Sequence, residues 1–187
     1  ANLNFKASDK NLTKATPVSL LLWAARVVDT ESPVHIAETA HRIFSAAGVT
    51  RPNKQLQNTM DEALDRLVAT GRVSRRGDFL WSNDMTQPPV RDRSGLPAST
   101  RKLDMISDDE LEEAICFVVE QSYGIAKSQA PKAMFTLLGY GRTNQAMKDR
   151  FSEVVESLIS AGLLGDDGEN LVLASPSRND SGHSSGN

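Results

Sequence analysis

The pattern of hydrophobic and polar positions occurs twice along this chain, with an offset of 91 residues and no gap. Phe44 matches Phe135 and Gly48 matches Gly139 under this offset. Chance would not place glycines at the same breaks and apolar residues on the same faces in both halves. The pattern therefore predicts two copies of one structural unit. Further pairs are Asn53 with Asn144, Leu67 with Leu158, Gly71 with Gly162, and Gly77 with Gly168.

The first copy predicts a helix, a short strand, two helices and a hairpin. Thr16 followed by Pro17 is typical of a helix start, and Pro33 disfavours helix at Ser32. Gly48 is expected to end the second helix, and an apolar stripe predicts the third. The expected elements lie at about residues 16–29, 32–36, 37–47, 51–70, 72–74 and 78–81.

The second copy predicts the same order of elements. They are expected at residues 108–121, 123–126, 128–138, 144–161, 162–164 and 170–173. This is the order of a winged-helix domain, a helix-turn-helix unit with a β-hairpin wing. We therefore predict an α+β, mostly α fold with tandem winged-helix domains. The expected organisation is a flexible segment at 1–15, domains at 16–84 and 107–173, an ordered linker at 85–106 and a flexible tail at 174–187.

Composition narrows the class of protein. No apolar run approaches the ~20 residues of a membrane span, and a single cysteine fits a reducing compartment. We expect a cytoplasmic protein with no membrane partner and no small-molecule substrate. The formal net charge of −3 gives no overall attraction to nucleic acid, so any DNA contact must rest on local charge.

Enzymatic chemistry finds little support in the residues. His35 and His41 are six positions apart and do not share a helix face, so His35 is interpreted as structural. Cys116 lies among apolar residues and is expected to be buried. The acidic stretch at 107–113 is interpreted as a helix start, with Ser107 as the cap and carboxylates at the positive end of the helix dipole. We predict no catalytic residue, no metal site and no cofactor.

The residues give more support to a DNA-binding function than to an enzymatic one, and this support is concentrated in the first copy. Residues 32–81 carry seven basic side chains against five acidic ones. The front of the third helix of a helix-turn-helix unit enters the major groove, where Arg, Lys, Gln and Asn read base edges. Arginines at a wing tip can contact the DNA backbone or the minor groove. The candidate DNA-binding residues are Arg51, Lys54, Gln55 and Asn58 on the helix, Arg72, Arg75 and Arg76 on the wing, and Arg91 and Arg93 in the linker.

Other observations favour a different partner. Asp61, Glu62 and Asp65 lie further along the third helix and would repel phosphate. The second copy has Asp166 and Asp167 at its wing, and its residues 122–173 contain five basic against six acidic side chains, which suits phosphate poorly. The alternative is therefore a protein-interaction or intramolecular scaffolding module. A free-standing transcription regulator is a third possibility, but no long dimerisation helix accompanies the two copies.

The segments "SPVHIAETAHRIFSAAGVTR", "RRGDFLW" and "PPVRDRSGL" carry a family resemblance. Together with the second half, over roughly residues 30–173, the chain resembles an uncharacterised bacterial domain of unknown function. That domain stands at the C-terminal end of large superfamily-1 helicase-like proteins, often beside a nuclease domain related to very-short-patch repair endonucleases. The resemblance implies a non-catalytic accessory module of a longer DNA-processing protein with an ATP-dependent helicase or a nuclease elsewhere, acting in anti-phage defence or DNA repair.

Overall fold

The protein is described by a computed structural model over residue 12, residues 16–97 and residues 101–174. Contacts divide the chain into two compact units, residues 1–113 and 114–187. The segments 1–15 and 174–187, expected to be flexible, lie outside the described residues except for Leu12 and Ala174. The prediction of a mixed and mostly helical fold is confirmed over the described ranges.

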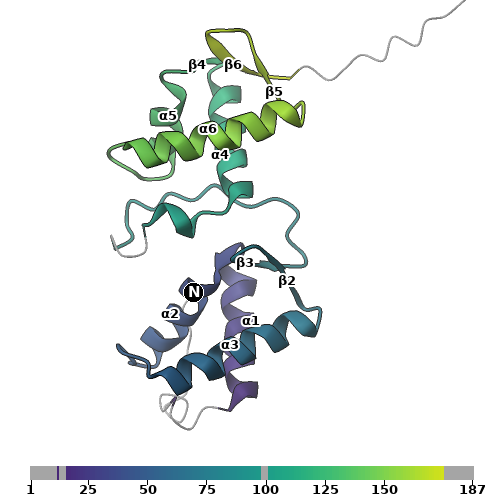
Figure 1. The fold of residues 1–187 in the computed structure, drawn as a ribbon, viewed down its shortest axis with the longest axis vertical. Helices are drawn as coiled ribbons and strands as arrows, with labels where there is room; N and C mark the ends of the chain where they lie inside the picture. The colour runs from purple at the N-terminus through teal and green to yellow at the C-terminus, as the bar shows by residue number, and fades with distance from the viewer. Residues whose placement is uncertain (1–11, 13–15, 98–100, 175–187) are drawn as a thin grey trace, which may run out of the picture. The chain divides into compact units, whose positions relative to one another are not determined.

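Three helices form most of the first unit: α1 (Pro17–Glu31), α2 (Ile36–Ala46) and α3 (Lys54–Ala69) (Figure 1). Each begins at a side chain that accepts a hydrogen bond from a first-turn amide, as helix starts require. Thr16 accepts from the amide of Ser19 at 3.2 Å, as predicted. His35 Nδ1 accepts from Ala37 at 3.0 Å, which confirms a structural role for this histidine. Asn53 accepts from Leu56 at 2.8 Å, so α3 begins two to three residues later than predicted.

A small antiparallel sheet closes the first unit. Its strands β1 (Val34–His35), β2 (Val73–Arg76) and β3 (Phe79–Ser82) lie in the order β1-β3-β2. Gly77, with φ at +55°, allows the tight turn between β2 and β3. The amide of Ile36 donates to the carbonyl of Asp78 at 2.9 Å, which places the hairpin tip beside the start of α2.

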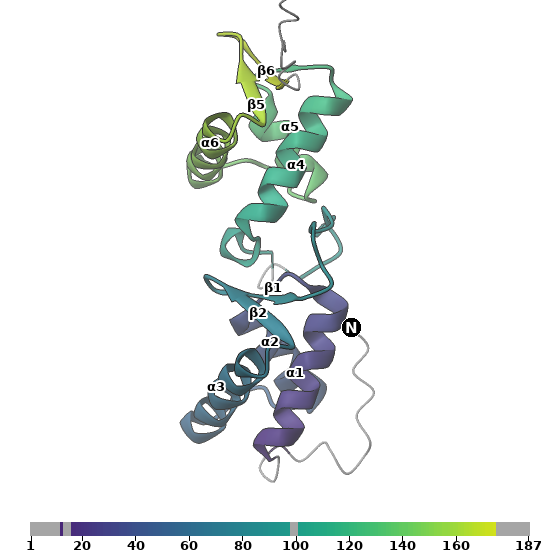
Figure 2. The same cartoon turned by 90° about the vertical axis from the view of Figure 1, so that its right-hand side faces the viewer.

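Apolar side chains from α1, α3 and the hairpin form the core of the first unit. The core includes Leu20 and Val27 of α1 and Leu67 of α3, all fully buried. From β3 it includes Leu80 and Trp81, whose exposed fractions are at most 1%. Because these positions follow helical and strand periodicity, one face of each element points inward and the other faces water. In Figure 2, α3 lies on one side of this unit and α1 on the other.

The second unit contains α5 (Ala130–Leu137), α6 (Gln145–Ser160) and the last part of α4 (Asp108–Gln121), within which the boundary falls. Its sheet has the order β4-β6-β5, from β4 (Ile125–Ala126), β5 (Leu164–Asp166) and β6 (Asn170–Leu173). Its core residues include Ile115, Met134, Phe135, Phe151, Leu158 and Leu171. Cys116 of α4 is only partly buried, contrary to the expectation that it is fully enclosed.

The two units repeat each other element by element. The bounds of β1, α3 and β3 coincide with those of β4, α6 and β6 under the offset of 91 residues. Glycines with positive φ recur at Gly48 and Gly139 and at Gly71 and Gly162. The main difference is α5, which begins at Ala130 after a turn in which Gln129 donates to the Ala126 carbonyl.

The extended stretch at residues 85–106 contains little regular structure in its described part. A single 3-10 turn occurs there, at Leu103–Met105, and Pro88 and Ile106 are buried. Among all the helices that the structure describes, none is long and apolar enough to cross a membrane.

Candidate nucleic-acid interface

The front of α3 presents a group of exposed polar and basic side chains. Arg51 lies just before the helix, and Lys54, Gln55 and Asn58 follow on its first turns. All four side chains are exposed, and within the described ranges none makes a hydrogen bond or an ion pair. Met60, Ala63, Leu64 and Leu67 bury the opposite face of the helix. The structure therefore brings these four predicted residues together, and their donors are available to a partner.

Charge changes sign along the exposed face of α3. Asp61, Glu62 and Asp65 are also exposed and continue the stripe on which Lys54 and Asn58 lie. A polyanion would be attracted to the first turns of the helix and repelled by the later ones. Contact through the start of the helix is the geometry by which helix-turn-helix units reach base edges.

The hairpin arginines differ from this group because each has a partner. Arg72 pairs with Asp29 of α1 at 2.7 Å. Arg75 donates to the Gly77 carbonyl at 2.9 Å and lies 3.7 Å from a carboxylate oxygen of Asp78.

Arg76 has two partners. Its guanidinium lies 4.0 Å above the ring of Trp81 and pairs with Asp109 at 3.1 Å. The three arginine side chains are 44–55% exposed, and ion pairs at such positions contribute little, so they remain exchangeable for contacts to another molecule.

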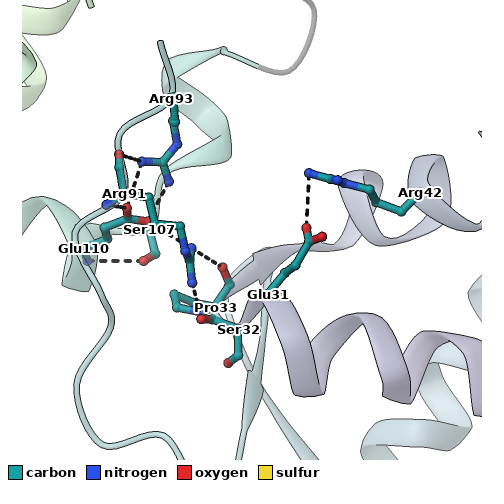
Figure 3. Close-up of polar contacts among 8 residues, drawn as sticks. All are labelled: Glu31, Ser32, Pro33, Arg42, Arg91, Arg93, Ser107 and Glu110. Carbon is teal, nitrogen blue, oxygen red and sulfur yellow. Dashed lines mark hydrogen bonds and ion pairs between the residues drawn. The ribbon is translucent and has the colours of Figure 1, made fainter. Parts of the chain in front are cut away.

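The two linker arginines are directed to a buried carboxylate. Arg93 makes two parallel hydrogen bonds to Glu110, at 2.8 and 2.7 Å, and its side chain is 6% exposed (Figure 3). Glu110 belongs to the first turn of α4, where its amide donates to the capping hydroxyl of Ser107 at 3.3 Å. Bidentate pairs of this kind are the strongest that arginine makes with a carboxylate. Arg93 is therefore not part of the surface proposed below.

Arg91 connects the same carboxylate to the turn before β1. Its backbone amide donates to Glu110 at 3.0 Å, and its guanidinium donates to the carbonyls of Ser32 and Pro33. Burial lowers the pKa of Arg91, nearby Glu110 opposes this shift, and Arg93 adds to it. The arginine stays charged because its ordinary pKa is far above neutrality. These contacts attach the linker to the first unit.

Sequence reasoning missed the role of Glu110. The sequence indicates that the acidic residues at 107–113 start a helix, and the observed cap at Ser107 confirms that interpretation. Its partners lie 17 and 19 positions earlier, and no local signal connects an arginine in a coil to a carboxylate in a later helix.

A hollow lies beside the contacts of Glu110, and each charged side chain in its lining has a hydrogen-bond or ion-pair partner. It measures about 360 Å³ and includes Glu31, Glu38 and Arg42 in its lining. Arg42 pairs with Glu38 at 2.7 Å and with Glu31 at 3.2 Å. No group of His, Cys, Asp and Glu suited to a metal ion was found among the described residues.

Part of the chain matches the model of a protein family. A family model described as "Protein of unknown function (DUF3320)" matches residues 13–58, a stretch that begins before α1 and ends within α3. The match is shorter than the resemblance expected over residues 30–173 and begins earlier. Comparison with curated proteins and with solved structures found no match.

Proposed function

We propose that the chain is a tandem winged-helix module whose first unit binds DNA through the front of α3. The observation that carries this proposal is the group Arg51, Lys54, Gln55 and Asn58, exposed and without partners among the described residues. The order helix, strand, helix, helix, hairpin and the strand order β1-β3-β2 support the winged-helix assignment. Arg72, Arg75 and Arg76 of the hairpin are proposed as secondary contacts to the phosphate backbone.

The repeat supplies an internal comparison for this proposal. The positions of Lys54, Gln55 and Asn58 are occupied in the second unit by Gln145, Ala146 and Asp149. There Gln145 donates to Asp149 at 2.7 Å, so these two side chains satisfy each other. At the corresponding positions the second unit keeps only the arginine, Arg142 in place of Arg51, and has no cation in place of Lys54.

In its biological setting the module is proposed to be a non-catalytic, cytoplasmic part of a bacterial helicase-like or nuclease-like protein. The resemblance of "SPVHIAETAHRIFSAAGVTR" and "RRGDFLW" supports this assignment. Such a module would hold the parent chain on DNA, in anti-phage defence or in repair, while another region performs the chemistry.

A charge-reversal experiment tests the DNA contact. The double variant Arg51→Glu, Lys54→Glu should weaken binding to a labelled DNA duplex about tenfold or more in fluorescence anisotropy at low salt. The matched control is Arg26→Glu, Lys102→Glu, which reverses one arginine and one lysine at exposed positions elsewhere on the first unit. Equal affinities for the two double variants would remove α3 from the interface.

The second candidate is a protein-interaction module without nucleic acid. It is favoured by Phe117, Leu163 and Leu173 of the second unit, which are 42–55% exposed although apolar. Absence of any duplex binding by the unaltered chain at low salt would favour this candidate over DNA.

A further inference from the structure

A basic hollow lies on the second unit where the turn after α5 meets the start of α6. It measures about 410 Å³, within the range of small-molecule sites. Lys132 of α5, Arg142 of the turn and Lys148 of α6 line it, together with the hydroxyl-bearing residues Ser128, Thr136 and Thr143. No carboxylate is among its lining residues.

Among the described basic residues of the second unit, those without an ion pair all line this hollow. Of the five basic side chains at residues 122–173, Lys127 pairs with Asp166 at 2.5 Å and Arg150 with Glu153 at 3.5 Å. The remaining three are those of the hollow, and no ion pair links any of them to another described residue. Counting five basic against six acidic residues over 122–173 therefore does not show that basic side chains are in excess around this hollow.

The start of α6 adds positive potential at the same place. Asn144 caps this 16-residue helix by accepting from Met147 at 3.0 Å, and Thr143 of the hollow directly precedes the cap. The first amides of a helix have no intrahelical acceptor, and the helix dipole favours an anion there. Lys148 also borders a second hollow that contains the carboxylates of Glu156 and Asp166. Asp166 is paired with Lys127, and no ion pair links Lys148 to Glu156.

We propose that this hollow binds a phosphate group through Lys132, Arg142 and Lys148. Three cations with neighbouring hydroxyl and amide donors suit a multiply charged oxyanion, and the corresponding positions in the first unit, His41, Arg51 and Gln57, do not reproduce the set. The site goes beyond the DNA contact proposed above, since it uses another unit and other residues. Its phosphate belongs either to a nucleic-acid backbone or to a small phosphate compound.

Titration calorimetry of the full chain with inorganic pyrophosphate, at fixed ionic strength, tests the site. The triple variant Lys132→Gln, Arg142→Gln, Lys148→Gln should bind pyrophosphate at least about tenfold more weakly than the unaltered chain. The matched control, Lys127→Gln, Arg150→Gln, removes the two paired cations of the same unit and should stay within about twofold. Circular dichroism checks folding, and Arg142→Gln alone, a change in a loop, serves if the triple variant unfolds.

Two results would overturn the site: no measurable binding to the unaltered chain, or equal affinities in the triple variant and the control. Displacement of pyrophosphate by duplex DNA would assign the site to a nucleic-acid backbone, and failure of DNA to displace it would assign the site to a small phosphate compound. The variant Arg51→Glu, Lys54→Glu should keep full pyrophosphate affinity. The DNA contact of the first unit can therefore fail without the phosphate site failing, and the reverse also holds.

Discussion

Glu110 has a side chain only 1% exposed, and N–H groups of Arg91 and Arg93 take the place of water around it. A carboxylate removed from water is tolerated only when such donors satisfy it. Two of these donors are rigidly paired because they belong to one guanidinium. The charge of Glu110 is therefore a structural requirement of the first unit.

We predict that Glu110→Gln lowers the free energy of unfolding of the first unit by about 3 kcal/mol. The substitution keeps the shape of the side chain but leaves the guanidinium of Arg93 buried without a counter-charge. Urea denaturation followed by tryptophan fluorescence measures the loss, since Trp81 is buried in this unit.

A double-mutant cycle supplies the control for this prediction. The double variant Glu110→Leu, Arg93→Leu should be less destabilised than the sum of its single variants, because both members of the buried bidentate pair are removed together. Only Arg91, whose side chain is 30% exposed, then loses its contact to Glu110 at 3.3 Å. Additive losses would contradict a direct interaction of the two side chains.

The two hairpins show how one element can be stabilised in different ways. In the first unit, Arg75 and Arg76 are held by Gly77, Trp81 and Asp109. In the second unit, Asp167 accepts from the amides of Glu169 at 3.1 Å and Asn170 at 2.7 Å. In the second hairpin the carboxylates belong to the turn itself and accept its backbone amides, whereas in the first the carboxylates of Asp78 and Asp109 pair with arginine side chains.

The acid sensitivity of the second hairpin follows from two lowered pKa values. The side chain of Lys127 and then the amide of Gly168 lower the pKa of Asp166, and the amide and then the side chain of Asn170 lower that of Asp167. A carboxyl whose pKa is lower in the folded state stabilises the fold above its unfolded value of 3.8, and the contribution is lost as pH falls through the folded value.

We therefore predict that Asp166→Asn, Asp167→Asn lowers the thermal midpoint of the second unit at pH 7. The difference from the unaltered chain should be present above the unfolded value of 3.8 and shrink as pH falls below it toward the lower folded values, measured by circular dichroism. Asp78→Asn in the first hairpin is the control, because that side chain is 73% exposed with a single partner at 3.7 Å. A gap that persists at low pH would show that ionisation is not its cause.

The order of elements was predictable because its signals are local and occur twice. Caps at Thr16 and Ser107 mark the first helix of each copy, and glycines mark the ends of the second and third helices, at Gly48 and Gly71 and again at Gly139 and Gly162. The late start of α5 was not predictable, because it depends on a turn rather than on helix propensity. Of the candidate site, the exposed front of α3 followed from periodicity. The partners of Arg76 and Arg93 are long-range pairs that one sequence does not reveal.

The net charge of the whole chain is negative, whereas the surface proposed to bind DNA is positively charged. The chain carries a formal charge of −3, which repels a polyanion at a distance. Attraction must therefore come from small groups of unpaired cations, and such groups act only within about a Debye length, roughly 10 Å at 0.1 M salt. Arg72 and Arg76 are engaged in ion pairs, whereas Arg51 and Lys54 at the front of α3 have none with another described residue.

The salt dependence of DNA binding tests this view of the whole chain. Each phosphate contact releases condensed counterions, so the logarithm of the binding constant falls with the logarithm of salt concentration by about 0.9 per contact. Changing Arg51 and Lys54 to Gln should reduce the magnitude of that slope by about 2, while Arg26→Gln, Lys102→Gln leaves it unchanged. If affinity falls at every salt concentration and the slope does not change, Arg51 and Lys54 contribute through shape or base contacts and do not neutralise phosphates.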